Sequence, residues 1–160
     1  MARLSITTLF AGLIASFGCG AAPTELPVRA SEVPLADRVA ADGLSATRVG
    51  TLQFYADTVR IEMPDRANRG VPLDIYVSTY SGGCVGSDTT VTAVQGLRAT
   101  VVPYQRVSTN PNLACPSILL IDRRRARIVF DTPGTATVRV IGREEPSGRL
   151  FAVERRIAVR

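Results

Sequence analysis

The stretch VPLDIYVSTYSGGC, residues Val71–Cys84, decides the fold. Apolar and β-branched side chains alternate along it with proline, aspartate, serine and tyrosine. This period of two predicts a strand that packs one face on a core and leaves Tyr76 and Tyr80 on the outward face. The strand runs into the turn-forming residues Ser81–Gly83 and then into Cys84, which predicts a corner of the fold at its end.

The first 18 residues predict a signal peptide. A short positive start is followed by the largely apolar run Leu4–Phe17, which is too short to span a bilayer, and then by small residues. Ser16-Phe17-Gly18-Cys19 resembles the bacterial lipobox, whose cysteine is acylated and becomes the first residue of the mature protein. Cys19 is therefore the expected lipidation site. Ordinary signal-peptidase cleavage after Ala21 or Ala22 is the alternative, and it would leave the protein secreted or periplasmic.

The lipobox resemblance implies a location and a first partner. Acyl chains on Cys19 would anchor the protein stably in a membrane. Gly20 follows and lacks the acidic side chain that is associated with inner-membrane retention of lipoproteins in some bacteria. These residues predict an outer-membrane lipoprotein of a bacterial cell envelope. Its expected partners are the membrane, through the N-terminal lipid, and an envelope protein or a polysaccharide.

Cys84 and Cys115 are expected to form a disulfide. Either route of N-terminal processing leaves these two cysteines as an even pair in an oxidising compartment, and both lie among turn-forming residues. Residues Gly82–Gly86 also fit the pattern G-x-C-x-G, a cysteine version of the nucleophile elbow. A disulfide is the better interpretation, because the chain has no histidine to generate a thiolate and the following residues predict a strand rather than a helix.

The rest of the chain divides into a linker and one domain. Residues 19–50 contain three prolines, many alanines and charges of both signs, which predicts a flexible linker with one helical turn near Leu35 and Val39. Residues 51–160 predict one strand after another and no convincing helix, which indicates an antiparallel β-sandwich or barrel. The expected strands are residues 58–63, 71–80, 89–95, 97–104, 118–121, 126–131, 135–141 and 150–159.

The last two expected strands carry a family resemblance. PGTATVRVIGR, residues 133–143, has a Pro-Gly turn followed by alternating small and β-branched residues, and it resembles the penultimate strand of bacterial immunoglobulin-like domains. The closing ERRIAVR is similar to their last strand, although Arg155 falls on its apolar side, which predicts a bulge or an edge position there. With its N-terminus, the chain resembles small bacterial lipoproteins that carry an immunoglobulin-like domain. That resemblance implies an immunoglobulin-like antiparallel β-sandwich at a cell surface and no reaction, and the chain departs from antibody domains in having no tryptophan.

The composition gives no support for catalysis. The chain has no histidine, and its acidic residues form no cluster with the spacing of metal ligands. All 19 basic residues are arginine, against 14 acidic residues, which indicates codon bias more than nucleic-acid binding because no nucleic-acid-binding motif accompanies them. We therefore expect a binding or structural module that is not an enzyme and has no cofactor, metal or nucleic-acid partner. A small envelope hydrolase that uses carboxylates is the alternative function.

Two features are expected to form a binding surface. The segment DRRRAR, residues 122–127, predicts a basic turn whose arginines contact phosphate-bearing lipid or polysaccharide. A set of outward tyrosines predicts an aromatic platform for a sugar or a partner protein. A solvated hairpin tip and a covering apolar layer are the respective structural alternatives. The residues concerned are Arg123, Arg124, Arg125 and Arg127 in the turn, and Tyr76 and Tyr80, joined by Tyr104, in the platform.

Overall fold

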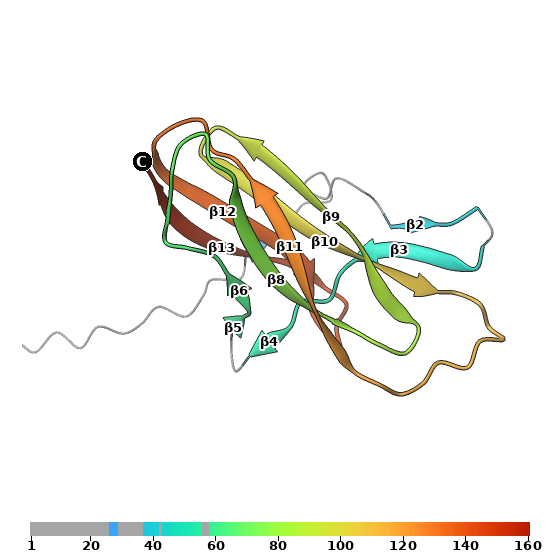
Figure 1. The fold of residues 1–160 in the computed structure, drawn as a ribbon. Coiled ribbons are helices and arrows are strands. Elements are labelled where there is room, and N and C mark those ends of the chain that lie inside the picture. Colours follow the sequence, from blue (N-terminus) through green and yellow to red (C-terminus); the bar gives the residue numbers. More distant parts are fainter. Residues whose placement is uncertain (1–25, 29–36, 42, 56–57) are drawn as a thin grey trace, which may run out of the picture.

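The computed structural model of the protein describes residues 26–28, 37–41, 43–55 and 58–160 (Figure 1). These residues form strands, turns and loops with no helix among them, which confirms the predicted all-β class. The six longest strands have 9–11 residues and all follow residue 72. In chain order the strands are β1 (Leu26–Pro27), β2 (Arg38–Val39), β3 (Ser45–Val49), β4 (Phe54–Tyr55), β5 (Thr58–Val59), β6 (Ile61–Glu62), β7 (Arg66–Ala67), β8 (Leu73–Ser81), β9 (Val85–Gln95), β10 (Arg98–Ser108), β11 (Leu120–Ile128), β12 (Gly134–Arg143) and β13 (Leu150–Val159).

Two sheets pack together as a sandwich. The large sheet has the order β1-β13-β12-β10-β3-β2, with β9 paired to β10 and β7 paired to β13. The small sheet has the order β11-β8-β6, and Figure 1 shows it layered over the large one. Among the described strands the pairing is antiparallel except between β10 and β12 and between β13 and β7, which run parallel.

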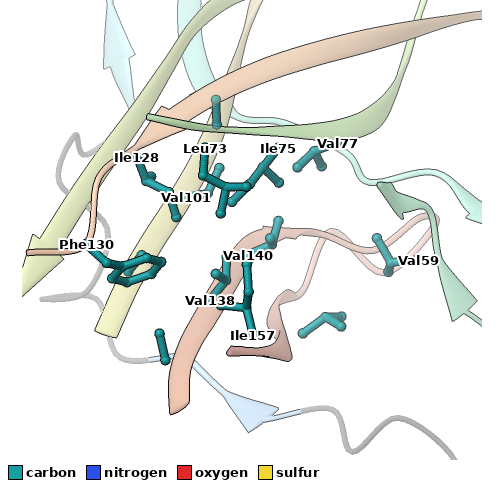
Figure 2. Close-up of a cluster of buried hydrophobic side chains, with 14 of the residues drawn as sticks. Val59, Leu73, Ile75, Val77, Val101, Ile128, Phe130, Val138, Val140 and Ile157 are labelled. Atoms are coloured by element: carbon teal, nitrogen blue, oxygen red, sulfur yellow. The ribbon is translucent and has the colours of Figure 1, made fainter. Parts of the chain in front are cut away.

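The core between the two sheets confirms the alternation predicted for β8. Leu73, Ile75 and Val77 are buried, whereas Asp74 and Tyr76 between them are partly exposed. A slip of one residue would exchange the two sets of side chains, so burial fixes the register of β8. Figure 2 shows the buried side chains of β8 gathered with Val101, Val138, Val140 and Ile157 of the large sheet.

A second apolar cluster lies on the opposite face of the large sheet. In β10, Val101 belongs to the core between the sheets and the next residue, Val102, belongs to the second cluster, because successive side chains of a strand point to opposite faces. Tyr104 lies two residues further on and is fully buried there. The prediction that Tyr104 joins an exposed tyrosine platform is therefore wrong. The buried members of this cluster are Val49, Val102, Tyr104, Ile141 and Ala152.

The large sheet begins before Thr51, the predicted start of the domain. Strand β3 pairs with residues Tyr104–Ser108 of β10, and β2 pairs with β3 at the place where the sequence suggests a helical turn. These residues extend the sheet because the backbone groups of β10 beyond its pairing with β12 need hydrogen-bond partners. Part of the predicted linker is thus built into the sandwich. The predicted signal peptide and Cys19 lie outside the described residues.

Arg155 occupies an edge position rather than a bulge. The register between β12 and β13 continues without interruption over the whole of both strands. On the other side of β13, β1 pairs only with Phe151 and Ala152, and β7 pairs only with Ala158 and Val159. Among the described residues no strand covers the middle of this edge. The charged side chain of Arg155 is tolerated on the apolar side of the strand because it lies at that uncovered edge.

Candidate functional site

The arginine-rich segment belongs to a strand rather than to a turn. Strand β11 pairs antiparallel with β8 residue by residue over its full length, and this includes all of residues 122–127. Ala126 and Ile128 are buried in the core between the sheets. The prediction of a basic turn is therefore wrong, because the segment satisfies its backbone groups against β8 and anchors its alternate side chains inside. Arginines at every second position consequently point to one face.

The pairing of β8 with β11 joins two features that are separate in the sequence. On the outward face of the small sheet, Arg125 lies opposite Tyr76 and Arg127 lies opposite Asp74. The guanidinium carbon of Arg123 lies 3.7 Å from the centroid of the Tyr76 ring, which is a cation–π contact. Tyr76 thus takes its predicted outward position, within a surface that we call the arginine face. The arginine face consists of Arg60, Glu62, Asp74, Tyr76, Arg123, Arg125 and Arg127.

Glu62 of β6 pairs with two arginines of this face. Its Oε2 accepts a hydrogen bond from Arg123 Nη2 at 2.6 Å, and its Oε1 accepts one from Arg60 Nε at 3.2 Å. The bond from Arg123 is the main reason that the pKa of Glu62 lies below its ordinary value. Glu62 lies opposite Tyr76 in the sheet, so the carboxylate and the tyrosine ring both hold the Arg123 guanidinium in position.

Asp74 of β8 pairs with the other two arginines. Arg125 Nη2 donates a hydrogen bond to Oδ2 at 2.6 Å, and Arg127 Nε donates one to Oδ1 at 3.0 Å. These bonds, that from Arg125 first, lower the pKa of Asp74 to about 2, and the same carboxylate raises the pKa of Arg125. The side chains of Arg125 and Arg127 remain 50% and 58% exposed, so an anion in solution can reach both guanidinium groups.

The Asp74 carboxyl is expected to titrate near pH 2 in the folded protein, as measured by carboxyl-carbon NMR. Arg125→Gln should move its pKa up towards the ordinary value of 3.8, because the largest of the bonds that favour the carboxylate is lost. Because the pKa is lower in the folded than in the unfolded chain, the pairing stabilises the fold above about pH 4, and this contribution is lost as the pH falls to about 2. Arg156→Gln, on the distant β13, is the control. An Asp74 pKa near 3.8 in the unmodified protein would contradict the pairing.

Arg124 lies on the other side of β11. It donates hydrogen bonds from Nη2 to the backbone oxygen of Asp88 and to Thr90 Oγ1, both in β9. Arg124 thus leaves β11 on the opposite side from Arg123 and Arg125, because side chains alternate along a strand, but all three line one hollow of about 400 Å³ together with Ser87, Thr90 and Asp122. Tyr80, by contrast, lies opposite Ile121 and on the same face of β8 as Tyr76, as predicted.

An exposed aliphatic segment, Ile118–Ile121, leads into β11. The sequence predicts a strand over these four residues, but only the last two belong to β11, and all four side chains are more than half exposed, with Leu119 at 72%. Figure 1 shows that the connection from β10 to β11 extends beyond the sandwich. Exposed apolar runs mark interaction sites. No sequence signal marks this exposure, because a run of four aliphatic residues without alternation, such as the one after the Cys-Pro-Ser turn, is also typical of a buried strand.

A groove of about 380 Å³ lies beside the aliphatic segment. Ile118 and Leu119 line it together with Tyr80, and so do the charged side chains of Arg48 and Glu145. Gln105 also lines the groove and is itself buried. Its Oε1 accepts a hydrogen bond from the Thr51 backbone N–H at 3.0 Å, and its Nε2 donates one to the backbone oxygen of Tyr80. This amide therefore ties β10 of the large sheet to β8 of the small sheet.

The predicted disulfide braces the corner between β8 and β9. The Cα atoms of Cys84 and Cys115 are 5.1 Å apart and their sulfurs are bonded, which confirms the pairing. Gly82 has a φ of 110°, and a Cβ at this position would overlap the backbone oxygen of Ile118. The glycine thus lets the loop that carries the aliphatic segment approach the turn closely. The cysteine of the G-x-C-x-G pattern is engaged in the disulfide.

In the described part of the chain, no group of three or more cysteine, aspartate or glutamate side chains is arranged to hold a metal ion. The same residues contain no helix of the length and apolarity needed to cross a membrane. The sequence matches no protein-family model and no curated protein, and no solved structure matches it either. The chemistry of the arginine face and of the aliphatic segment therefore carries the argument about function.

Proposed function

We propose that the protein is a non-catalytic module of a bacterial cell envelope that docks on a membrane surface rich in anionic lipid. The observation that carries this proposal is the order of side chains on the outward face of β11. Ile121, at the end of the aliphatic segment, is followed on the same face by Arg123 and then by Arg125. Aliphatic groups that enter the membrane interface beside cations that meet the headgroups are a recurrent means of peripheral membrane binding.

The charges of the arginine face favour an anionic partner. Four guanidinium groups share the two carboxylates of Glu62 and Asp74, which leaves an excess of two positive charges. Guanidinium groups bind phosphate oxygens in a bidentate manner, and the existing ion pairs hold them in place without covering them. Each arginine near an anionic membrane contributes about 1 kcal/mol to binding. The face is thus preorganised for several headgroup phosphates at once.

The proposal has two further elements: Cys19 is lipidated, and the sandwich belongs to an immunoglobulin-like family. The lipobox resemblance of residues 16–19 supports the first, and the resemblance of residues 133–143, which lie largely within β12, supports the second. The acyl chains on Cys19 would anchor the chain, and a protein surface that also binds the membrane is a second, independent signal. The docking face would supply such a second signal and would hold the sandwich against the bilayer.

Vesicle flotation tests the proposal. The chain without the predicted signal peptide, residues 19–160 with Cys19→Ser, is used so that neither the apolar leader nor an acyl chain contributes, against neutral phosphatidylcholine vesicles and vesicles that also contain phosphatidylglycerol. Binding is expected only to the anionic vesicles. Arg123→Ser combined with Arg125→Ser should weaken it about 30-fold, because two contributions of about 1 kcal/mol are lost. Arg98→Ser combined with Arg156→Ser removes the same charge from exposed positions of the large sheet and should change binding little.

A second pair of substitutions tests the aliphatic segment. Ile118→Ser combined with Leu119→Ser should also reduce binding to anionic vesicles, because both exposed side chains lose their apolar surface. If the Arg123/Arg125 variant and its charge-matched control lose the same binding affinity, net charge alone drives binding. That result would overturn the arginine face as the docking surface. Binding to an anionic polysaccharide with no binding to either kind of vesicle would overturn the lipid surface as the partner.

A further inference from the structure

Strand β9 forms a long edge of the large sheet. It pairs with β10 on one side, and among the described residues no strand pairs with it on the other (Figure 1). The first part of this edge is covered by side chains of β11, since Arg124 bonds to the backbone oxygen of Asp88 and Asp122 bonds to Ser87. From Val91 onward no such contact covers it in the described part of the chain. Unpaired strand edges are templates for pairing with another chain.

The hydrogen bonds of β10 show which backbone groups of β9 face outward. The backbone oxygen of Leu97, just before β10, accepts a bond from Thr137 at 2.8 Å, and that of Pro103 accepts one from Gly50 at 2.8 Å, both on the side away from β9. Because backbone groups alternate along a strand, Val101 also points away from β9. Its partner in β9 is Thr92, which therefore directs its own backbone N–H and C=O outward. Val94, opposite Ala99, does the same by the same alternation.

The open edge differs in its charge from the uncovered middle of β13 and from the edge strands β2 and β6. Residues 89–95, TTVTAVQ, contain no charged side chain in a chain with 33 charged residues. The uncovered middle of β13 contains Glu154-Arg155-Arg156, and β2 and β6 are two-residue strands that carry Arg38 and Glu62. Two copies of one strand that pair about a two-fold axis bring like side chains together, which is unfavourable for charged residues. Only the β9 edge, among these described edges, avoids that repulsion.

We propose that the β9 edge binds a second copy of this chain. The two β9 strands pair antiparallel about a two-fold axis at Ala93, so that Thr92 of one copy lies opposite Val94 of the other and the large sheets of both copies form one continuous sheet. The outward N–H and C=O groups of Thr92 and Val94 then gain partners. The side chain of Val94 lies on the core-bearing face of the sheet, opposite Ala99, and is 38% exposed in one copy. Pairing covers this apolar surface as well.

Analytical ultracentrifugation of the chain without the predicted signal peptide, residues 19–160 with Cys19→Ser, tests this proposal. A concentration-dependent dimer is expected. Thr92→Pro should raise its dissociation constant at least tenfold, because it removes an N–H that serves the partner and makes no bond to β10. Val94→Lys should do the same by placing two like charges near each other across the axis. Val71→Lys, at an exposed position outside β9, is the control and should leave the dimer unchanged.

The outcomes separate this edge from other sites of self-association. An unmodified chain that stays monomeric at the highest attainable concentration would overturn the proposal, and so would a dimer that survives both β9 substitutions. A dimer abolished by Ile118→Ser combined with Leu119→Ser and unaffected by Thr92→Pro would place the interface on the aliphatic segment instead. Unchanged thermal unfolding of a dilute sample of each variant shows that the fold is intact.

Discussion

Replacing Gln105 with leucine is expected to lower the free energy of unfolding by about 2–6 kcal/mol. Gln105 is 1% exposed, and its amide serves the Thr51 backbone N–H with one atom and the Tyr80 backbone oxygen with the other. Leucine has a similar size but offers neither a donor nor an acceptor. Each backbone group left buried without a partner costs about 1–3 kcal/mol, and the two sheets lose a direct link. Chemical denaturation of both proteins measures the difference.

Gln105→Glu separates loss of hydrogen bonding from loss of packing. The introduced carboxyl keeps an acceptor for Thr51, and when protonated it also donates to the Tyr80 oxygen. Burial beside that oxygen raises its pKa above that of the unfolded chain. This variant should therefore approach the stability of the unmodified protein below about pH 4 and lose stability as the pH rises through its folded pKa. A leucine variant within about 1 kcal/mol of the unmodified protein would show that the amide bonds are not needed.

The strands that bury one face along their whole length were predictable. The alternation of residues 150–159 predicted β13, and that of residues 135–141 predicted most of β12. In β8 the same pattern predicted both the buried face and the outward position of Tyr76 and Tyr80. Each of these strands places every second side chain against a core, so the sequence itself records which face is inside. The disulfide followed from the number of cysteines and their turn-forming surroundings.

Strand β11 was mistaken for a turn because its partners are distant in the sequence. A run of arginines next to an aspartate has the composition of a solvated loop, and its alternation is hidden by Arg124, which bonds to β9. The groups that make the other arginines favourable in a strand are Asp74 and Glu62, which precede Arg125 and Arg123 by 51 and 61 residues. Only the pairing of the strands brings them together. The arginine face is thus a product of tertiary structure.

Tyr104 was misplaced for a related reason. Strand β10 lies inside the large sheet and buries side chains on both faces, Val101 on one and Val102 with Tyr104 on the other. A strand that is apolar on both faces shows no alternation from which an outward side could be read. The same absence of alternation hid the exposure of the aliphatic segment, Ile118–Ile121. An apolar run without alternation therefore does not by itself distinguish a buried strand from an exposed segment.

Removing the Cys84–Cys115 disulfide is expected to lower the free energy of unfolding by about 3–4 kcal/mol. The bond joins residues 31 apart, and the chain-entropy model relates its effect to the length of that loop. Cys84→Ser combined with Cys115→Ser should lower the melting temperature by about 10–20 °C. The reduced form of the unmodified protein should show the same shift, because it lacks the same constraint without any change of sequence.

The first structural effect of removing the disulfide is expected at the corner that carries the aliphatic segment. The loop before β11 contacts the β8–β9 turn through the close approach at Gly82, and Gly83 also lies close to the backbone oxygen of Pro116. Without the disulfide the loop is held by noncovalent contacts at this turn and by the bond of the Thr109 backbone N–H to the Leu44 oxygen, so hydrogen exchange of residues 110–119 should accelerate before that of the core strands. Anionic-vesicle binding should weaken with it, since Ile118 and Leu119, which precede β11, are then held less firmly beside the arginine face. A double variant that melts within about 2 °C of the unmodified protein would show that the core strands, and not the covalent bond, hold this corner in place.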